Sequence, residues 1–358
     1  MKTLRTVGIE TSCDETAVAV LDGDGRIETE LMASQVAAHA RYGGVVPELA
    51  SREHLRALPW LVNEALAGAA RPPELVAVTA GPGLVGALLV GVRYAAAFAW
   101  GRSLPLVGVD HLEAHLVSPF LDVGGGPALP MPERVLALVA SGGHSSWYLI
   151  KDGRPRQLCR TRDDAAGESF DKVAQALGLP YPGGPVVDRI ARSGDPDAVP
   201  LPRPRLSDSR LDFSFSGLKS AAVRWIRDHS LAAADGVEPG APVRDLLASF
   251  ERAVVEQLLA PLPELVDEHH PRLLTASGGV AANSELRRRL AELAAALGIE
   301  LRLPALRLTT DNAAMVARAG QLAHARGDWS DPRRIDARPR EAWQPPGMRG
   351  LSPRLGGV

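Results

Sequence analysis

Two histidines in the segment VDHLEAHLVSPFL have the spacing of a metal-chelating pair. His111 and His115 are four residues apart, which on a helix places both imidazoles on one face. Such pairs also occur as ordinary hydrogen-bonded side chains on a half-buried helix. The pair therefore predicts a metal site only if a third ligand lies nearby.

Asp311, in the segment LTTDNAAMVARAG, is the candidate third ligand. The pattern predicts a strand-to-helix junction there, where a carboxylate either caps the helix or reaches a metal ion. Two imidazoles and one carboxylate suit Fe²⁺ or Zn²⁺ as a Lewis acid, and these ligand types do not separate the two metals. A zinc protease is disfavoured, because Leu112 stands where its motif needs a glutamate and Glu113 comes one position later.

The stretch DDAAGESFDKVAQALGLPYPGGPVVDRIA combines several carboxylates. Asp171 and Asp188 are of the type that binds ribose hydroxyls in nucleotide sites. The apolar positions Phe170, Val173 and Leu177 equally predict an ordinary amphipathic helix. Both interpretations remain open for different residues of the stretch.

Two further segments carry candidate ligand-binding residues. Residues 181–185, with sequence YPGGP, predict a rigid turn. Asn283 stands just before a predicted helix, whose N-terminus favours an anion. Its side chain either contacts a ligand or caps the helix together with Ser284.

The elements that must position these side chains follow a repeated plan. Residues 3–23 and 135–153 each predict a strand, a small polar turn, a second strand and a closing Asp-Gly turn. The two segments align at one constant offset, which matches Thr11 with Ser141 and Asp22 with Asp152. The chain is therefore predicted to contain two copies of one supersecondary unit.

Glycine-rich or small polar turns follow four of the predicted strands. One such turn is an ordinary connection, but four at the carboxyl ends of strands predict a ligand site in a cleft between two α/β lobes. Glycine lets backbone N–H groups approach phosphate oxygens, so a nucleotide or an acyl phosphate is the expected ligand. The turns are Thr11-Ser12, Gly81-Pro82-Gly83, Ser141-Gly142-Gly143 and Ser277-Gly278-Gly279.

Composition limits the class of protein. A chain of 358 residues, 46% hydrophobic, has the length of two ordinary domains. Cys13 and Cys159 have no paired spacing, and no apolar run approaches the roughly 20 residues of a membrane span, so a cytoplasmic protein without a membrane partner is expected. A net charge of -2 argues against bulk electrostatic coating of nucleic acid, so RNA would bind a local patch.

Two segments are predicted to lack helices and strands. Residues 200–209 predict a loop, and the Pro/Arg-rich tail from Gly327 predicts a segment that wraps the surface or lacks regular structure.

Nine blocks between Val7 and about Gly320 have a recognisable order: GIETSCDETAVAV, GGVVPELASREH, TAGPGLVGALLVG, DHLEAH, ASGGHSS, DDAAGESFDKVAQALGLPYPGGP, FSFSGLKSA, ASGGVAAN and TTDNAAM. With these blocks the chain resembles the TsaD family of tRNA N6-adenosine threonylcarbamoyltransferases, formerly described as sialoglycoproteases. Two departures are ASGGHSS, where the family usually has VSGGHT, and the long tail; neither removes a proposed ligand.

The resemblance implies a duplicated actin-like (ASKHA) α/β fold, with two lobes around a central cleft. Its implied divisions are 1–110 for the first lobe, completed by a C-terminal helix, 111–325 for the second lobe with the metal and nucleotide site, and 326–358 for the tail. The implied reaction transfers threonylcarbamoyl from threonylcarbamoyl-AMP to the N6 amine of the adenosine 3′ of the anticodon in tRNAs reading ANN codons. AMP is the leaving group.

The resemblance also implies site residues and partners. A divalent metal, Fe²⁺ before Zn²⁺, would be held by His111, His115 and Asp311. The implied partners are tRNA, a TsaB-like paralogue and a TsaE-like ATPase. The implied substrate and nucleotide site comprises Val139, Ala140, Ser141, Gly142, Gly143, Asp171, Gly184, Asp188 and Asn283.

Some alternatives stay open at the level of sequence. The duplicated hairpin and glycine turns also occur in actin-like sugar or acetate kinases, which predict no metal-bound histidines. A non-catalytic scaffold is disfavoured by the complete set of chemical residues. The general base that removes the N6 proton is not identified, since Glu10, Asp14, Glu48 and a substrate phosphate all qualify.

Overall fold

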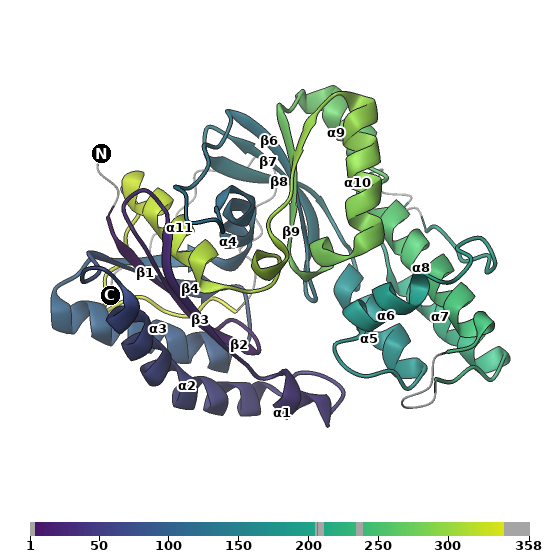
Figure 1. Cartoon of the computed structure of the whole chain (residues 1–358), viewed down its shortest axis with the longest axis horizontal. Coiled ribbons are helices and arrows are strands. Elements are labelled where there is room, and N and C mark those ends of the chain that lie inside the picture. The colour runs from purple at the N-terminus through teal and green to yellow at the C-terminus, as the bar shows by residue number, and fades with distance from the viewer. Residues whose placement is uncertain (1–3, 205, 207–210, 234–238, 340–358) are drawn as a thin grey trace, which may run out of the picture.

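Two five-stranded mixed sheets form the framework of the molecule (Figure 1). The structure is a computed structural model that describes residues 4–204, 206, 211–233 and 239–339. The first sheet has the order β3-β2-β1-β4-β5, and the second has the order β10-β9-β6-β7-β8. The strands are β1 (Thr6–Glu10), β2 (Glu15–Leu21), β3 (Ile27–Ser34), β4 (Leu75–Gly81), β5 (Leu106–Asp110), β6 (Arg134–Ala140), β7 (Ser145–Lys151), β8 (Arg154–Arg160), β9 (Leu273–Ser277) and β10 (Glu300–Arg302).

The second sheet repeats the first. In each, a central strand pairs antiparallel with the next strand of its hairpin and parallel with a later strand, β4 for β1 and β9 for β6. Both predicted hairpins are present, because β1 and β2 flank the turn at Thr11 while β6 and β7 flank the turn at Ser141. The internal duplication expected from the sequence is therefore confirmed.

Helices cover both sheets. On the first sheet, α2 (Pro47–Gly68) and α3 (Val85–Arg102) pack on one face, and α11 (Ala313–Ala325) packs on the other. The second sheet packs against a helical layer in the right half of Figure 1. The remaining helices are α1 (Val36–Ala40), α4 (His111–Val117), α5 (Ala166–Ala176), α6 (Gly183–Ala191), α7 (Ser216–Asp228), α8 (Ala241–Leu259), α9 (Leu262–His269) and α10 (Ser284–Leu297), with short 3-10 turns η1 (Ser118–Phe120), η2 (Gly279–Ala282) and η3 (Leu306–Leu308).

The short helix α4 lies between the two sheets. Its Ala114 and Val117 belong to the core under the first sheet, whereas Leu112 and Leu116 belong to a cluster on the second sheet. A helix that is apolar on both sides is buried by two partners. This packing fixes the remaining face of α4, which carries the two histidines, at the junction of the two halves.

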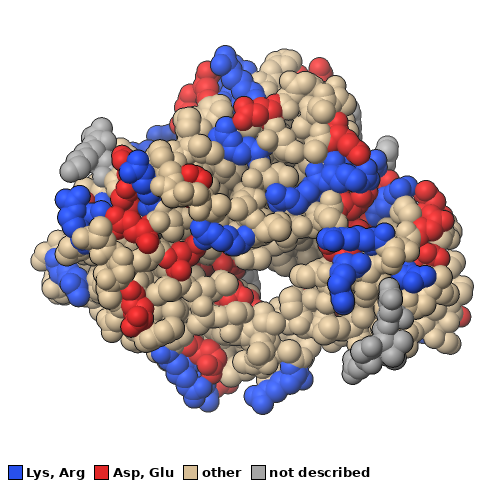
Figure 2. Space-filling view, in the orientation of Figure 1, with Lys and Arg blue, Asp and Glu red and all other residues tan. Residues whose placement is uncertain are grey.

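An opening separates the two halves on one side of this junction. Figure 2 shows it passing between the purple-to-blue half and the teal-to-green half of Figure 1. The two halves come close together at one edge of this opening. There, a Cβ added at Gly43, just beyond α1, would lie 2.9 Å from the Gln175 side chain of α5. The predicted central cleft is thus present between the two sheets.

The chain beyond α11 returns to the first sheet. Ser330 N donates to Leu106 O at 2.7 Å, Arg338 N donates to Ala80 O at 2.6 Å, and Ile335 is buried in the core under that sheet. Residues 328–339 therefore wrap the surface of the first half. The rest of the predicted tail, 340–358, lies outside the described residues, as do 205 and 207–209 of the predicted loop. None of the described helices has the length and apolar character that crossing a membrane requires.

Candidate metal and nucleotide site

Helix α4 presents His111 and His115 side by side. Asp110 at the end of β5 caps the helix, because its carboxylate accepts hydrogen bonds from Leu112 N at 2.9 Å and Glu113 N at 3.3 Å. Both imidazoles are buried, and their ring centroids are 4.7 Å apart. The helical pair predicted from the spacing is confirmed.

Asp311 completes the group from the opposite end of the chain. Its Oδ1 lies 3.1 Å from His115 Nε2 and 3.4 Å from His111 Nε2. The predicted strand before Asp311 is wrong, since the short 3-10 turn η3 precedes it. Asp311 does not cap the helix either, because the adjacent Asn312 accepts a hydrogen bond from Met315 N at 2.9 Å. The Asp311 carboxylate is therefore left to face the histidines.

The ligand atoms have the donor types and the convergence that a metal ion needs. One ligand atom each from His111, His115 and Asp311 can be chosen so that all lie within 4.8 Å of one another. The Nδ1 atom of His115 is buried without a hydrogen-bond partner. Two imidazole nitrogens and a carboxylate oxygen fit Fe²⁺ or Zn²⁺ with positions open to other ligands.

Charges at the site favour an ionised Asp311. Burial alone would raise the pKa of Asp311, but the two histidines outweigh it and hold the pKa well below its usual value. Burial and the neighbouring His111 lower the pKa of His115. For His111, burial opposes protonation, yet the charges of Asp311 and Glu10 raise its pKa well above the usual value.

Glu10 lies directly behind His111. Its Oε2 is 3.1 Å from His111 Nδ1 and accepts a hydrogen bond from the Thr79 hydroxyl at 2.7 Å, while Oε1 accepts one from Ser12 N at 2.6 Å. The carboxylate is completely buried. A carboxylate that holds one ring nitrogen orients the other nitrogen toward a metal, so Glu10 positions His111.

The glycine turns meet in two pairs at the strand ends. Gly83 lies close to Ser12, since an added Cβ would be 2.6 Å from Ser12 O. Gly278, with φ of 88°, lies closer still to Ala140, where the distance to Ala140 O would be 2.3 Å. The first pair reaches the metal group through Ser12, whose hydroxyl is 3.3 Å from His111 Nδ1. Next to the second pair, burial and then the charges of His111 and His115 lower the pKa of His144 to about 4.

The turn after β6 leaves its glycines open. Val139 and Ala140 are the buried end of β6, and Ser141 N donates to His144 O at 2.7 Å. A Cβ added at Gly142 or Gly143 would meet no atom within 4 Å. The space in front of these two Cα atoms is therefore open, as the approach of a phosphate or acyl oxygen requires, although Gly142 N itself lies against Gly167 of α5.

The carboxylate stretch forms two helices joined at Tyr181-Pro182. The amphipathic interpretation is confirmed for α5, where Phe170 and Val173 are buried. Asp171 on α5 accepts a hydrogen bond from Gly183 N at 2.7 Å. The predicted turn at 181–185 is only partly right, because Gly183 already begins α6. Gly184 lies in that first helical turn, where an added Cβ would meet nothing within 4 Å.

Asp188 and Asn283 meet at the start of α10. Asp188 Oδ1 accepts hydrogen bonds from the backbone N and hydroxyl of Ser284, at 2.7 and 2.6 Å. Asn283 caps the helix, as its Oδ1 accepts from Leu286 N at 2.9 Å, and its Nδ2 donates to Glu251 at 2.6 Å. The capping prediction for Asn283 is confirmed, and its amide nitrogen is committed to a second residue.

Several polar residues of the site were not predicted from sequence. Ser12 was predicted only as part of a turn. His144 and Glu251 were not predicted as site residues, because the residues that surround them come from distant segments of the sequence. Of the candidate bases, Glu10 is bound to His111, and Glu48 is exposed and paired with Arg52 on α2. Asp14 is half-buried, and burial followed by the charge of Asp311 raises its pKa.

Comparison with known proteins extends these observations. The sequence profile described as TsaD, tRNA N6-adenosine threonylcarbamoyltransferase, matches residues 26–318. A protein of that name from Pelobacter propionicus is 50% identical over 318 residues, covering 88% of this chain and 90% of the relative. One from Moorella thermoacetica is 45% identical over 328 residues, covering 90% and 93% of the two chains.

Solved structures share the fold at low sequence identity. HypF from T. kodakarensis superposes with a TM-score of 0.57 at 14% identity, over 89% of this chain and 48% of that chain. The activator of the 2-hydroxyisocaproyl-CoA dehydratase from Clostridium difficile gives a TM-score of 0.50 at 16% identity, over 90% and 96% of the two chains. The expected duplicated actin-like α/β fold is therefore confirmed. Because the profile matches residues 26–318 and these relatives are 45–50% identical along about nine-tenths of the chain, the chain belongs to the TsaD family of tRNA N6-adenosine threonylcarbamoyltransferases.

Proposed function

We propose that this enzyme transfers the threonylcarbamoyl group of threonylcarbamoyl-AMP to the N6 amine of the adenosine 3′ of the anticodon, in tRNAs that read ANN codons. A bond forms between N6 and the carbamoyl carbon, the carbon–oxygen bond to the phosphate breaks, N6 loses a proton, and AMP leaves. The observation that carries the proposal is the convergence of His111, His115 and Asp311 beside open glycine turns in a member of this family.

The chain's own residues suit an already activated donor. The reaction needs mainly to hold the weakly nucleophilic amine against the carbonyl and to stabilise the oxyanion that develops. The open backbone at Ser141 to Gly143 would bind phosphate or acyl oxygens. Asp171, Gly184, Asp188 and Asn283 would line the adenylate beyond this turn.

His111, His115 and Asp311 would hold one divalent ion, Fe²⁺ or Zn²⁺. When bound, such an ion supplies Lewis acidity toward a substrate oxygen. Glu10 keeps His111 oriented, and the low pKa of Asp311 keeps its carboxylate ionised. We propose the first lobe as 1–110 completed by α11, the second as the rest of 111–325 and the tail as 326–358. We also propose a cytoplasmic enzyme that works with a TsaB-like paralogue and a TsaE-like ATPase.

The test incubates purified protein with unmodified tRNA, threonylcarbamoyl-AMP and the candidate partner proteins. Digestion of the RNA and mass spectrometry should detect N6-threonylcarbamoyladenosine, and His111→Ala or Asp311→Ala should reduce it by at least about a hundred-fold. Full activity of His111→Ala after metal stripping would contradict the metal assignment. A lack of product with all partners present would favour the alternative, an actin-like phosphotransferase, to be screened with ATP and small hydroxylated substrates.

A further inference from the structure

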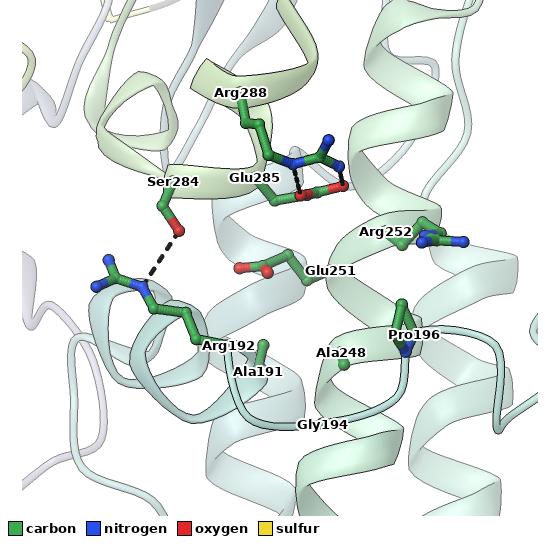
Figure 3. Close-up of a pocket in the computed structure, with 10 residues that line it drawn as sticks. All are labelled: Ala191, Arg192, Gly194, Pro196, Ala248, Glu251, Arg252, Ser284, Glu285 and Arg288. Atoms are coloured by element: carbon green, nitrogen blue, oxygen red, sulfur yellow. Dashed lines mark hydrogen bonds and ion pairs between the residues drawn. The ribbon is translucent and has the colours of Figure 1, made fainter.

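Two buried histidines of the first half have no part in the proposed site. His39 on α1 and His54 on α2 are completely buried, and neither belongs to the metal group. Neither lines the cavity of the second half, which residues of α6, α8 and α10 surround (Figure 3). His54 ends the block GGVVPELASREH, residues 43–54, which the proposed function does not use. Buried polar groups need hydrogen-bond partners, and those of the two histidines lead to the turn between β1 and β2.

His54 holds the carbonyl group of Cys13. Its Nε2 lies 3.0 Å from Cys13 O, and because a carbonyl oxygen only accepts, Nε2 carries the hydrogen. Nδ1 is then the acceptor, and the hydroxyl of Thr16 donates to it at 2.7 Å. Burial lowers the pKa of His54, which favours this neutral form. The imidazole therefore joins the two sides of the turn, with Cys13 before Asp14 and Thr16 after it.

Gln35 holds the next carbonyl group of the turn, because its backbone N donates to Asp14 O at 3.0 Å. Its side chain is fixed by the two histidines. Val46 N donates to His39 Nδ1 at 3.3 Å, so His39 Nε2 is the nitrogen that donates to Gln35 Oε1, at 3.1 Å. This leaves Gln35 Nε2 as the donor that faces His54 Nδ1 at 3.3 Å. The network thus has one consistent direction for every hydrogen.

The turn that these hydrogen bonds hold borders the metal group. The Ser12 hydroxyl is 3.3 Å from His111 Nδ1. Asp14 follows two residues later and is half-buried, and burial followed by the charge of Asp311 raises its pKa. Of the three carboxylates considered above as bases, Asp14 is the one that remains, since the other two are bound elsewhere.

We propose that His54 and Gln35 are positioning residues for the transfer reaction, and that they act through Asp14 by holding the carbonyl groups on either side of its Cα. A carboxylate fixed in this turn can accept a hydrogen bond from the N6 amine and orient the amine toward the carbamoyl carbon. A displacement of about 1 Å in such a group can cost roughly a hundred-fold in rate. The inference rests on the proposed function for the identity of the reaction, and it assigns a function to the block that ends at His54.

The test measures single-turnover transfer to tRNA, with saturating threonylcarbamoyl-AMP and the partner proteins present. His54→Leu removes both hydrogen-bonding nitrogens and should slow transfer by about ten-fold or more. The Kd for threonylcarbamoyl-AMP and the affinity for Zn²⁺ should stay within about two-fold of the wild type, because His54 touches neither site. His54→Gln keeps one donor and one acceptor and should recover most of the rate.

Gln321 supplies the matched control for the loss of a buried polar side chain. It is 1% exposed on α11, and its Nε2 donates to the carbonyl groups of Leu4 and Asp22 at 3.0 and 2.7 Å, at the opposite end of the same hairpin. Gln35→Leu and Gln321→Leu should both lower the midpoint of urea unfolding, since each leaves buried partners unpaired. Only Gln35→Leu should slow transfer, by several-fold or more.

A double-mutant cycle shows whether His54 acts through Asp14. Asp14→Asn alone should slow transfer by about ten-fold or more. Adding His54→Leu to it should change the rate by less than about two-fold, because the group that His54 positions has already lost its charge. Two effects that multiply would mean that the residues act independently, which would overturn the inference.

Two other results would also overturn it: transfer by His54→Leu at the rate of the wild type, or an equal loss of rate in Gln321→Leu and Gln35→Leu. Failure of the proposed function looks different. In that case the wild type itself would form no threonylcarbamoyladenosine with tRNA and partners present, and the inference would fall with it. An active wild type with an equally active His54→Leu would refute the inference alone.

Discussion

Glu10 and His111 show how one buried residue conditions another. The 3.1 Å contact between Glu10 Oε2 and His111 Nδ1 orients the imidazole so that Nε2 faces Asp311, 3.4 Å away, on the side where a metal would be held. Replacing such a carboxylate typically costs roughly 10- to 100-fold in metal affinity. We therefore expect Glu10→Gln to weaken binding of Zn²⁺ or Fe²⁺ by about ten-fold or more, measured by titration against a competing chelator.

Glu113 supplies the matched control for this prediction. It lies on α4 between the two histidines and faces Arg326, at 3.9 Å, instead of the metal group. Glu113→Gln should leave metal affinity within about two-fold of the wild type. Equal metal affinities in Glu10→Gln and the wild type would show that Glu10 has no orienting function.

The metal group was largely predictable from sequence, and its surroundings were not. His111 and His115 lie on one helix, so their spacing in the sequence was enough to predict that the two side chains share a face. Asp311 was chosen from a motif, although the element before it was predicted wrongly. The contact of Glu251 with Asn283 joins α8 to the cap of α10, and no local periodicity encodes a tertiary contact of this kind.

At the scale of elements, the distance between β1 and α11 sets the position of Asp311. A Cβ added at Gly8 on β1 would lie 2.4 Å from Ala313 O and 2.6 Å from Ala317 N, which are backbone atoms of α11. Gly8→Ala must therefore push α11 away from the sheet. We expect a loss of about 2 kcal/mol or more in the free energy of unfolding, and weaker metal binding because Asp311 immediately precedes this helix. Urea unfolding and metal titration measure the two effects.

Gly101 on α3 supplies the control for Gly8→Ala. It tests whether the loss of stability comes from the close packing around Gly8 or from replacing any glycine by alanine. A Cβ added there would meet nothing within 4 Å. Because alanine favours a helix interior over glycine by roughly 0.5–1 kcal/mol, Gly101→Ala should leave stability unchanged or slightly increased. A Gly8→Ala variant as stable as the wild type would mean that α11 tolerates a larger separation from β1.

At the scale of the whole molecule, the duplicated architecture was predictable because both copies carry the same pattern of strand, polar turn and strand. The return of the chain end was not predictable in detail, because residues 328–339 have no hydrophobic periodicity and their contacts with the first half depend on tertiary packing. The close approach of Gly43 and Gln175 across the opening likewise depends on how the two halves pack. Sequence patterns thus predict repeated elements better than the contacts that join them.

Ile335 links the chain end to the first half of the molecule. It is 8% exposed, its Cδ1 packs closely on Gly108 of β5, and its carbonyl accepts a hydrogen bond from Arg93 on α3 at 3.0 Å. Truncating a buried isoleucine to alanine costs about 2–5 kcal/mol, and the low end is expected at this edge position. Ile335→Ala should therefore lower the midpoint of urea unfolding, whereas Arg334→Ala, whose side chain is 88% exposed, should not. If the two variants unfold alike, residues 328–339 do not stabilise the first sheet; if they differ as expected, the chain end contributes to the stability of the half that supplies Glu10 and Ser12 to the metal group.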